Sequence, residues 1–452
     1  MISAIGLISA LALLIWMTIR GVNILIAGPV AAAVVALTSG IAWLPPLAAE
    51  GAPNFATSYM DGFVGFFADW FFIFLLGAIF GEVMGRTGAA ASIAHAVTKA
   101  LGPRFALAAV VLATAILTYG GVSVFIVAFA VYPLAVQLFR SADLPHRFIP
   151  GALAFGSVTF TMTSAGSPEI QNLIPMQYLG TTAWAGAGVS LIVAILMASL
   201  GYFFLSRMIA RAVAKGEHFE PRKGVDDDTR DPSELPRWWA ALLPLVTVFS
   251  VFLIFQYPEY LGALSNILPP ESLGKWALVV ALGSGIVVAA LIGLRSRERL
   301  PTAFSIGATG AVVAITNTCA VVGFGTVAQL TPAFQQALGA VQSLPGDPLI
   351  GAAIAVTVIA GLTGSASGGQ SIALPLIAPH YLAEGANPAE LHRVVAIASG
   401  ALDSLPHNGY VVTTIRAVCG ETHARAYPAV AMTTLLVPVI GTIVAIALFT
   451  IF

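Results

Sequence analysis

Apolar runs long enough to cross a hydrocarbon core recur from the first residues of the chain to the last. A helix of about 17–25 apolar residues spans a bilayer, so the pattern predicts an all-α polytopic membrane protein. The opening run, residues 2–18, lacks the basic segment and cleavage site of a signal peptide, and we expect a retained helix there. Composition agrees, since 58% of the residues are apolar and 9% are charged, against about 25% charged residues in soluble domains.

One long polar stretch, residues 207–237, divides the chain into two apolar parts of similar length. Basic residues near the ends of spans favour the cytoplasmic side, so we expect this stretch to be a cytoplasmic linker. The same rule gives residues 1–206 an odd number of crossings, so residues 238–452 begin on the opposite side and have inverted topology. Arg393 falls outside in this scheme and is its exception.

Polar residues interrupt an apolar run once in each half of the chain. In the first half the interruption lies at 119–123, and in the second half at 364–371. Glycine permits a tight reversal of the chain, so we predict re-entrant helical hairpins over residues 105–138 and 349–382. Residues 1–85 would supply scaffold helices.

A second interruption follows each hairpin, again in both halves. Thr, Ser, Gly and Pro gather at 163–168, and Asp, Ser, Pro, His and Asn gather at 403–409. Because proline lacks the amide donor that continues a helix, we predict broken helices over 148–175 and 392–415. A His-Arg pair precedes each break, and the two pairs lie 246 positions apart (392 − 146), as expected for two inverted repeats.

The four polar interruptions predict a substrate site. Backbone that leaves the helix at membrane depth must be buried in protein or line a wet cavity, and free amides at helix N-termini suit a carboxylate. The alternative is that these small residues only allow close helix packing. The candidate substrate contacts are the small and polar residues of the four segments: Thr118, Gly120, Gly121, Ser123, Ser164, Gly166, Ser167, Asn172, Ser365, Ser367, Gly368, Gly369, Gln370, Ser371, Ser404 and Asn408.

Ionisable residues inside apolar runs are few, and they are functional by default. Asp403, His407 and Glu169 flank the two breaks and are the candidates for binding a coupling proton, whereas a structural role would be to cap a broken helix end. No arginine or lysine lies within the four polar segments. We therefore expect the proton and the substrate anion to neutralise one another.

Two other groups of ionisable residues have simpler interpretations. Glu82 lies close to Arg86 near the expected cytoplasmic end of a span, where a surface position and a buried one are both open. His146-Arg147 and His392-Arg393 stand just before apolar runs, and we interpret them as anchors at the membrane interface.

Several classes of function are disfavoured by the sequence. It carries no His-Glu-x-x-His, Gly-x-Ser-x-Gly, Gly-Lys-Ser/Thr or Cys-x-x-Cys motif, so we expect no enzyme, no metal and no cofactor. A net charge of −1 argues against a nucleic-acid partner. An anion channel and a sodium-coupled carrier remain alternatives, because broken helices also line pores and free carbonyls coordinate Na⁺.

Two motifs carry a resemblance to a known family. Residues 159–163 read Thr-Phe-Thr-Met-Thr, residues 166–175 read Gly-Ser-Pro-Glu-Ile-Gln-Asn-Leu-Ile-Pro, and residues 401–409 read Ala-Leu-Asp-Ser-Leu-Pro-His-Asn-Gly. Together they resemble the gluconate permease family of the ion-transporter superfamily. The resemblance implies a proton-linked symporter of a bacterial inner membrane, built as a homodimer of chains with two inverted repeats whose transport domain moves like an elevator.

The resemblance also bears on the substrate. The gluconate branch has a stretch rich in His and Pro where this chain has Thr-Ser-Ala-Gly-Ser-Pro at 163–168. The motifs look closer to those of the branch that takes 3-hydroxybutyrate and similar short hydroxy acids. This implies a small hydroxy-monocarboxylate, with contacts around residues 164–172 and 403–408. Gluconate or another organic acid is the alternative substrate.

Overall fold

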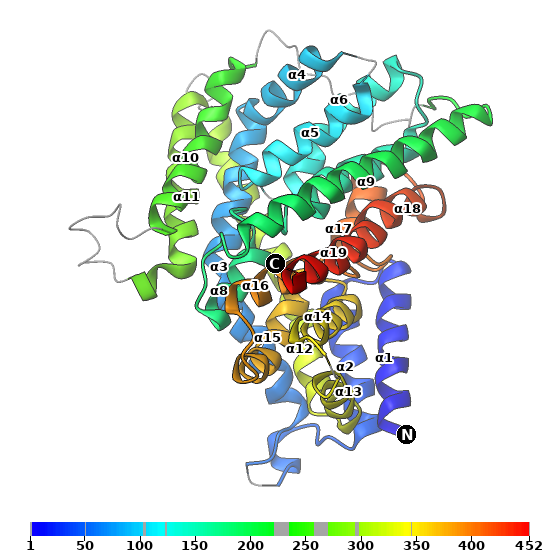
Figure 1. Cartoon of the computed structure of the whole chain (residues 1–452), viewed down its shortest axis with the longest axis vertical. Helices are drawn as coiled ribbons and strands as arrows, with labels where there is room; N and C mark the ends of the chain where they lie inside the picture. The colour runs from blue at the N-terminus through cyan, green and yellow to red at the C-terminus, as the bar shows by residue number, and fades with distance from the viewer. Residues whose placement is uncertain are drawn as a thin grey trace.

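Helices make up the regular structure of the described chain, apart from one isolated bridge between Ala42 and Asn54 (Figure 1). The computed structural model describes residues 2–49, 51–102, 105–122, 124–220, 235–256, 270–293, 298–344 and 346–451. The candidate contact Ser123 lies outside these ranges.

The helices fall into two sets that are joined by the polar stretch. The first set is α1 (Ile2–Ile19), α2 (Ile24–Ser39), α3 (Phe55–Arg86), α4 (Ala89–Leu101), α5 (Ala106–Tyr119), α6 (Val124–Ser141), α7 (Ile149–Ala154), α8 (Ile170–Leu179) and α9 (Ala187–Ala214). The second set is α10 (Trp238–Gln256), α11 (Pro270–Ile292), α12 (Leu300–Gln329), α13 (Pro332–Gln342), α14 (Pro348–Thr363), α15 (Ala366–Ala383), α16 (Pro388–Ser399), α17 (Gly409–Val412), α18 (His423–Ala431) and α19 (Val437–Ile451).

The apolar surface of the molecule is that of a membrane protein. Five helical segments in the described ranges are long and apolar enough to cross a bilayer: Phe55–Arg86, Ala187–Ala214, Trp238–Phe255, Leu300–Gln329 and His423–Ile451. Large apolar side chains on α9, among them Leu191, Ile195 and Phe203, are exposed, as lipid-facing side chains are. The prediction of an all-α polytopic membrane protein is confirmed.

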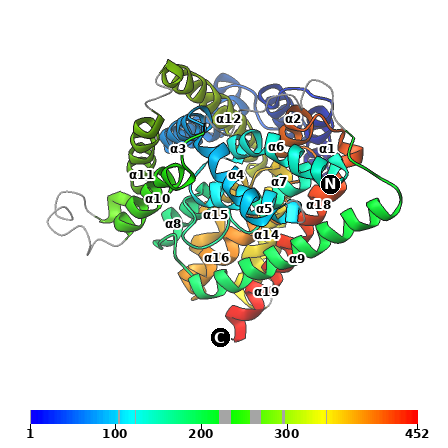
Figure 2. The same cartoon turned by 90° about the horizontal axis from the view of Figure 1, so that it is seen from above.

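The long helices α3 and α12 pack antiparallel along their lengths. Gly307 lies against the backbone of Ile79 and Gly323 against that of Tyr59, where an added Cβ would stand 2.7 Å and 2.8 Å from the nearest atom. Small residues at such contacts let two helices approach closely without a hydrophobic driving force. This pair, with α10 and α11 beside it, lies at one side of the molecule (Figure 2).

Two pairs of antiparallel helices occupy the segments expected to form hairpins. The first hairpin, α5 and α6, turns at Gly120 and Gly121, and the second hairpin, α14 and α15, turns at Gly364 and Ser365. Gly121 has φ +88° and Gly364 has φ +60°, which side-chain-bearing residues rarely adopt. In Figure 2 both hairpins lie between α9 at one edge and α10 and α11 at another.

Both helices that follow the hairpins are interrupted. The first break, residues 160–169, separates α7 and its π-helical extension Phe155–Thr159 from α8. The second break, residues 400–408, separates α16 from α17, which continues as the π-helical turn Thr413–Val418. Such π-helical turns are frequent beside functional sites.

The polar stretch begins later than its composition indicates. Helix α9 continues through Ala214, so residues 207–214 are helical and only the residues beyond them could form a linker. Residues 221–234 lie outside the described chain.

The first His-Arg pair reaches into the second half. His146 contacts Glu421 through Nδ1 at 2.9 Å, and Arg147 donates from Nη1 to the carbonyl of Arg425 at 3.3 Å. His146 is 2% exposed, so its interpretation as an interfacial anchor is wrong, whereas Arg147 is half-buried at the surface.

The second His-Arg pair makes the reciprocal contacts. His392 Nδ1 lies 2.6 Å from the Thr181 hydroxyl, and Arg393 donates from Nε to the carbonyl of Ala185 at 3.0 Å. Both side chains are fully buried, so these residues are not interfacial anchors either. The exception of Arg393 to the charge rule disappears, because the residue does not lie in a loop.

Candidate substrate cavity

A cavity of about 530 Å³ lies where the hairpin tips and the breaks meet. Small-molecule sites commonly measure about 300–1,000 Å³. The wall takes Gly121 and residues 364–367 from the hairpins, residues 168–171 from the first break and the start of α8, and residues such as Asp403 and His407 from the second break. The turn between α1 and α2, with α3, α11 and α12, completes it.

Four helices begin at this cavity. Val124 of α6, Ile170 of α8, Ala366 of α15 and Gly409 of α17 are first-turn residues, and all four line the wall. The first amides of a helix have no partner within it, and its N-terminus carries roughly half a positive charge. The cavity wall therefore includes four helix N-termini, and in α15 and α17 one first-turn amide is already bonded to Ser365 or Asn408.

Each hairpin tip touches the break of its own half. A Cβ added to Gly121 would lie 3.4 Å from Pro168 Cγ, and one added to Gly364 would lie 2.5 Å from His407 Nε2. A larger residue cannot replace Gly364 without displacing the imidazole. The two contacts bring the tips and the breaks into the same wall.

Asn408 fastens the second break. Its Nδ2 donates to the carbonyls of Gly364 at 2.9 Å and Asp403 at 3.1 Å, and its Oδ1 accepts from the amide of Val411 at 2.9 Å. One side chain thus caps α17, closes the break and holds the hairpin tip.

Asn172 fastens the first break in a similar way. Its Nδ2 donates to the carbonyls of Ser164 at 2.6 Å and Ser167 at 3.0 Å. Tyr119, at the tip of the first hairpin, donates its hydroxyl to the carbonyl of Ala165 at 2.7 Å. Carbonyls that the helix has released are in this way bonded within the protein, as the apolar surroundings require.

The cavity wall holds the three side chains foreseen for proton coupling, and the phenol of Tyr410 lines it as well. Glu169 and Asp403 are carboxyls in its wall, and Asp403 accepts a hydrogen bond of 2.8 Å from the Ser404 hydroxyl. Both ring nitrogens of His407 are buried and have no partner among the described residues. The three groups share the cavity, and no direct hydrogen bond joins any two of them in the described chain.

The helices α3, α11 and α12 contribute mostly apolar residues to the lining. Ile73 and Phe74 of α3, Leu278 of α11 and Val321 of α12 are among them, and we call this part of the lining the apolar face. Asn317 of α12 is a polar residue on this side, and its Oδ1 is buried without a partner in the described chain. The cavity therefore offers a polar face and an apolar face to one ligand.

Comparison with known proteins decides the family. The model of the GntP family permeases matches residues 1–449. The chain belongs to the GntP permease family. It is therefore a multi-pass membrane transport protein, and its family is one of permeases, as the motifs at both breaks indicated.

Relatives of this permease are transporters too. It is 35% identical over 447 aligned residues to the uncharacterized transporter YxjC of Bacillus subtilis. The alignment covers 92% of this chain and 93% of the relative. A Haemophilus influenzae uncharacterized transporter is 31% identical over 175 residues, 38% of this chain and 39% of its own. The chain also matches the crystal structure of the Alcanivorax borkumensis YdaH transporter, which is described as having an unusual topology. The TM-score is 0.56 and the sequence identity 16%, over 96% of this chain and 98% of that one. The two proteins therefore share the fold.

Eight of the described candidate residues of this permease line the cavity: Gly121, Glu169, Ser365, Ser367, Asp403, Ser404, His407 and Asn408. Seven of them come from both hairpin tips and the second break. Glu169, directly after the predicted segment 163–168, is the one candidate from the region of the first break. Ser365 also accepts the amide of Gly368 at 3.1 Å and so caps α15.

The other described candidates lie behind the wall and support it. Gly120 packs against Leu245, and Gly369 packs against the backbone of Ala360. Gln370 donates to the carbonyl of Gln171 at 3.1 Å and so joins α15 to α8. The remaining candidates are likewise absent from the cavity wall: Thr118, Ser164, Gly166, Ser167, Asn172, Gly368 and Ser371.

Two residues of the site were missed. Asn317 lies between two threonines in the mostly apolar helix α12, and Tyr410 directly follows the motif that ends at residue 409. Each has a buried polar atom without a partner among the described residues. A polar residue in the middle of the apolar run 300–329 was the available signal for Asn317.

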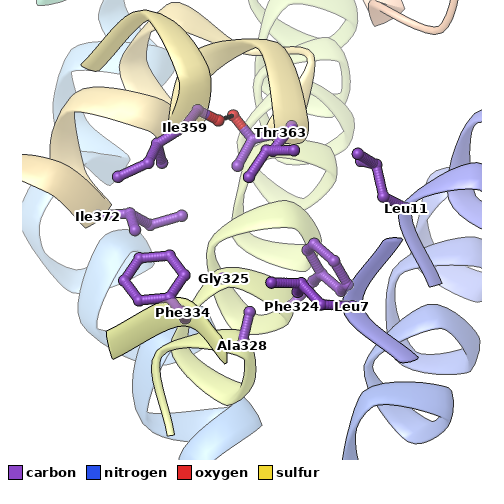
Figure 3. Close-up of a pocket in the computed structure, with 10 residues that line it drawn as sticks. Leu7, Leu11, Phe324, Gly325, Ala328, Phe334, Ile359, Thr363 and Ile372 are labelled. Atoms are coloured by element: carbon purple, nitrogen blue, oxygen red, sulfur yellow. Dashed lines mark hydrogen bonds between the residues drawn. The ribbon is translucent and has the colours of Figure 1, made fainter. Parts of the chain in front are cut away.

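A second, much smaller pocket lies behind the second hairpin (Figure 3). Its volume is about 10 Å³, and its lining is apolar except for Thr363, whose hydroxyl donates to the carbonyl of Ile359 at 2.9 Å. About one water-sized probe fills such a volume. It is a packing gap between α12, α13 and the hairpin, and it has no room for a substrate.

Proposed function

We propose that this GntP permease is a secondary active transporter that carries a small hydroxy-monocarboxylate, such as 3-hydroxybutyrate, together with a proton across a bacterial inner membrane. One observation carries the proposal: four helix N-termini and two carboxyl groups line a single cavity of molecular size. The N-termini suit an anion, and the carboxyl groups suit a proton.

The helix ends argue for a carboxylate substrate. First-turn amides of α6, α8, α15 and α17 lie at the wall, and hydroxyls of Ser365, Ser367 and Ser404 lie among them. Amide donors and positive dipole ends are what binds anions at helix N-termini elsewhere.

The carboxyl groups argue for proton coupling. With Glu169 and Asp403 both ionised, an entering anion would be a third negative charge in a site of low dielectric constant, where unpaired charge costs several kcal/mol. Binding a proton at Asp403, His407 or Glu169 removes that repulsion. The loaded site then crosses the membrane more readily than a half-loaded one.

The two faces of the cavity argue for a short, partly apolar substrate. The apolar face holds Ile73, Phe74 and Leu278, with Asn317 as its amide. A polyhydroxylated acid such as gluconate would press hydroxyls against this face without partners, which is unfavourable. A hydroxybutyrate can set its carboxylate at the helix ends and its methyl group on the apolar face.

Alternating access follows from the symmetry we propose for the chain. The reciprocal His-Arg contacts and the antiparallel α3–α12 pair are what two inverted repeats would produce. In an elevator mechanism, the hairpins and broken helices move as one body against a scaffold that includes α3 and α12. The cavity lies between these two groups of elements.

The test is uptake of labelled 3-hydroxybutyrate into proteoliposomes, with and without an inward proton gradient. We expect saturable uptake that the gradient stimulates, that excess gluconate leaves unchanged and that persists when choline replaces Na⁺. Uptake that requires Na⁺ would reject proton coupling. Non-saturable flux would indicate a channel, and competition by gluconate would reject the substrate class.

A further inference from the structure

Arg393 is the largest fully buried side chain of the described permease. Its guanidinium donates four hydrogen bonds: Nε to the carbonyl of Ala185 at 3.0 Å, Nη2 to that of Ala183 at 3.0 Å, and Nη1 to that of Thr163 at 2.6 Å and to Oδ1 of Asn172 at 2.8 Å. All four acceptors are neutral oxygens.

The corresponding cations of the first half are paired with carboxylates. Arg147 donates to both oxygens of Glu217, at 2.6 Å and 2.9 Å, and His146 contacts Glu421. No ion pair within the described ranges includes Arg393. A buried charge without a counter-charge is costly, so its retention needs a reason beyond packing.

Arg393 holds the first break in shape. Together with Asn172, which it contacts, it satisfies the carbonyls of Thr163, Ser164 and Ser167. Asn172 lies in the first turn of α8, whose N-terminal residues line the cavity. Arg393 is therefore linked through Asn172 to the first turn of α8, whose residues Ile170 and Gln171 line the cavity.

We propose that Arg393 is the positioning residue of the anion site: through Thr163 and Asn172 it directs the N-terminus of α8 into the cavity, and its unpaired charge favours an anion there. This inference rests on the proposed function for the identity of the anion, but its structural part does not. The bound carboxylate would supply a negative charge at the N-terminus of α8 that remains when Glu169 and Asp403 of the same cavity are protonated.

Two titratable groups stand near this guanidinium. His392 precedes it on α16 and contacts Thr181, and Tyr119 reaches the first break through Ala165. Neither is a carboxylate, so neither replaces the missing counter-charge.

Three variants separate the roles of Arg393. Arg393→Gln removes the charge, Arg393→Lys keeps it and loses the forked geometry, and Asn172→Ala removes the link to the break while the charge stays. The matched control is Arg147→Gln in the first half, which lies away from the cavity. Each protein would be placed in nanodiscs for hydrogen–deuterium exchange and in proteoliposomes for 3-hydroxybutyrate uptake.

We expect Arg393→Gln to speed exchange at residues 163–172 by about tenfold or more, corresponding to at least about 1.4 kcal/mol, with residues 400–408 unchanged. The half-saturating substrate concentration should rise by about tenfold, and Arg393→Lys should recover most of that rise. Asn172→Ala should speed exchange at the same residues with a smaller rise in half-saturation, and Arg147→Gln should leave half-saturation unchanged.

Unchanged exchange and half-saturation in Arg393→Gln would overturn the inference. So would equal losses in Arg393→Gln and Arg393→Lys with faster exchange throughout the protein, which would indicate a general role in folding. If the wild-type protein moved no monocarboxylate, the proposed function would fail, while the exchange experiment would still decide whether Arg393 positions the break.

Discussion

Asn408 donates a hydrogen bond of 2.9 Å to the carbonyl of Gly364, and this contact joins the second break to the hairpin tip that it faces. The tip residue Gly364 lies against His407, and both line the cavity with Ser365. A movement of the hairpin would therefore change the surroundings of His407, which is one of the groups that we expect to bind the proton. In the function that we propose, this contact would link substrate binding at the tip to proton binding at the break.

We expect a side chain at position 364 to be unfavourable, because the His407 ring would have to move. In Gly364→Ala, the new Cβ would stand 2.5 Å from the His407 ring on a backbone with φ +60°, so we expect a loss of about 2–4 kcal/mol of stability and little uptake. Gly385→Ala is the control, because φ is +88° there but nothing lies within 4 Å. Thermal unfolding and uptake should change strongly in Gly364→Ala and only slightly in Gly385→Ala. Equal effects in the two variants would contradict the importance of the contact between position 364 and His407.

Asp403 and His407 should be needed for coupling more than for binding. In Asp403→Asn and His407→Ala we expect exchange of labelled substrate to continue, while a proton gradient no longer drives accumulation above the external concentration. Glu82→Gln is the control, because Glu82 pairs with Arg86 at 3.2 Å and does not line the cavity. Full gradient-driven accumulation in both variants would rule out this coupling scheme.

We expect Asn317 to accept a hydrogen bond from the hydroxyl group of the substrate. Its buried Oδ1 has no partner in the described chain, and one neutral hydrogen bond is worth about 1 kcal/mol. In Asn317→Leu we expect the preference for 3-hydroxybutyrate over butyrate to fall by about fivefold to tenfold, measured by competition. Thr318→Val, on the same wall, offers a comparison, and an unchanged preference in Asn317→Leu would exclude this role.

Glu217 should contribute stability that depends on pH. The hydrogen bonds from Arg147 lower the pKa of Glu217 below its ordinary value of 4.5, so the stabilisation is complete above pH 4.5 and is lost as the pH falls through the lowered pKa. Glu217→Gln should melt earlier than the wild type at pH 7. The difference should vanish in acid, and a difference that stayed constant down to low pH would contradict the ion pair.

The segments that form the cavity could be predicted because their polar residues interrupt apolar runs. Asp403, His407 and Glu169 stand out in the sequence for the same reason, since charge is rare at membrane depth. Which member of a polar cluster faces the cavity depends on the helix turn, so Ser367 lines the wall while Gln370 bonds to α8 behind it.

Arg393 could not be placed from the sequence. Its partners are mostly backbone carbonyls, such as those of Ala183 and Ala185, and the side chains of these residues give no polar signal. A cation just before an apolar run is usually an anchor at the membrane surface. The tertiary contact between the halves of the chain, which no local pattern records, buries it instead.

The most direct test of the account is proton movement driven by substrate alone. Proteoliposomes would hold a pH-sensitive dye, with the membrane potential clamped and no initial pH difference, and 3-hydroxybutyrate would be added outside. We expect the interior to acidify in the wild type, and Asp403→Asn to show no acidification. Entry of labelled substrate into wild-type vesicles without any change in internal pH would contradict proton symport.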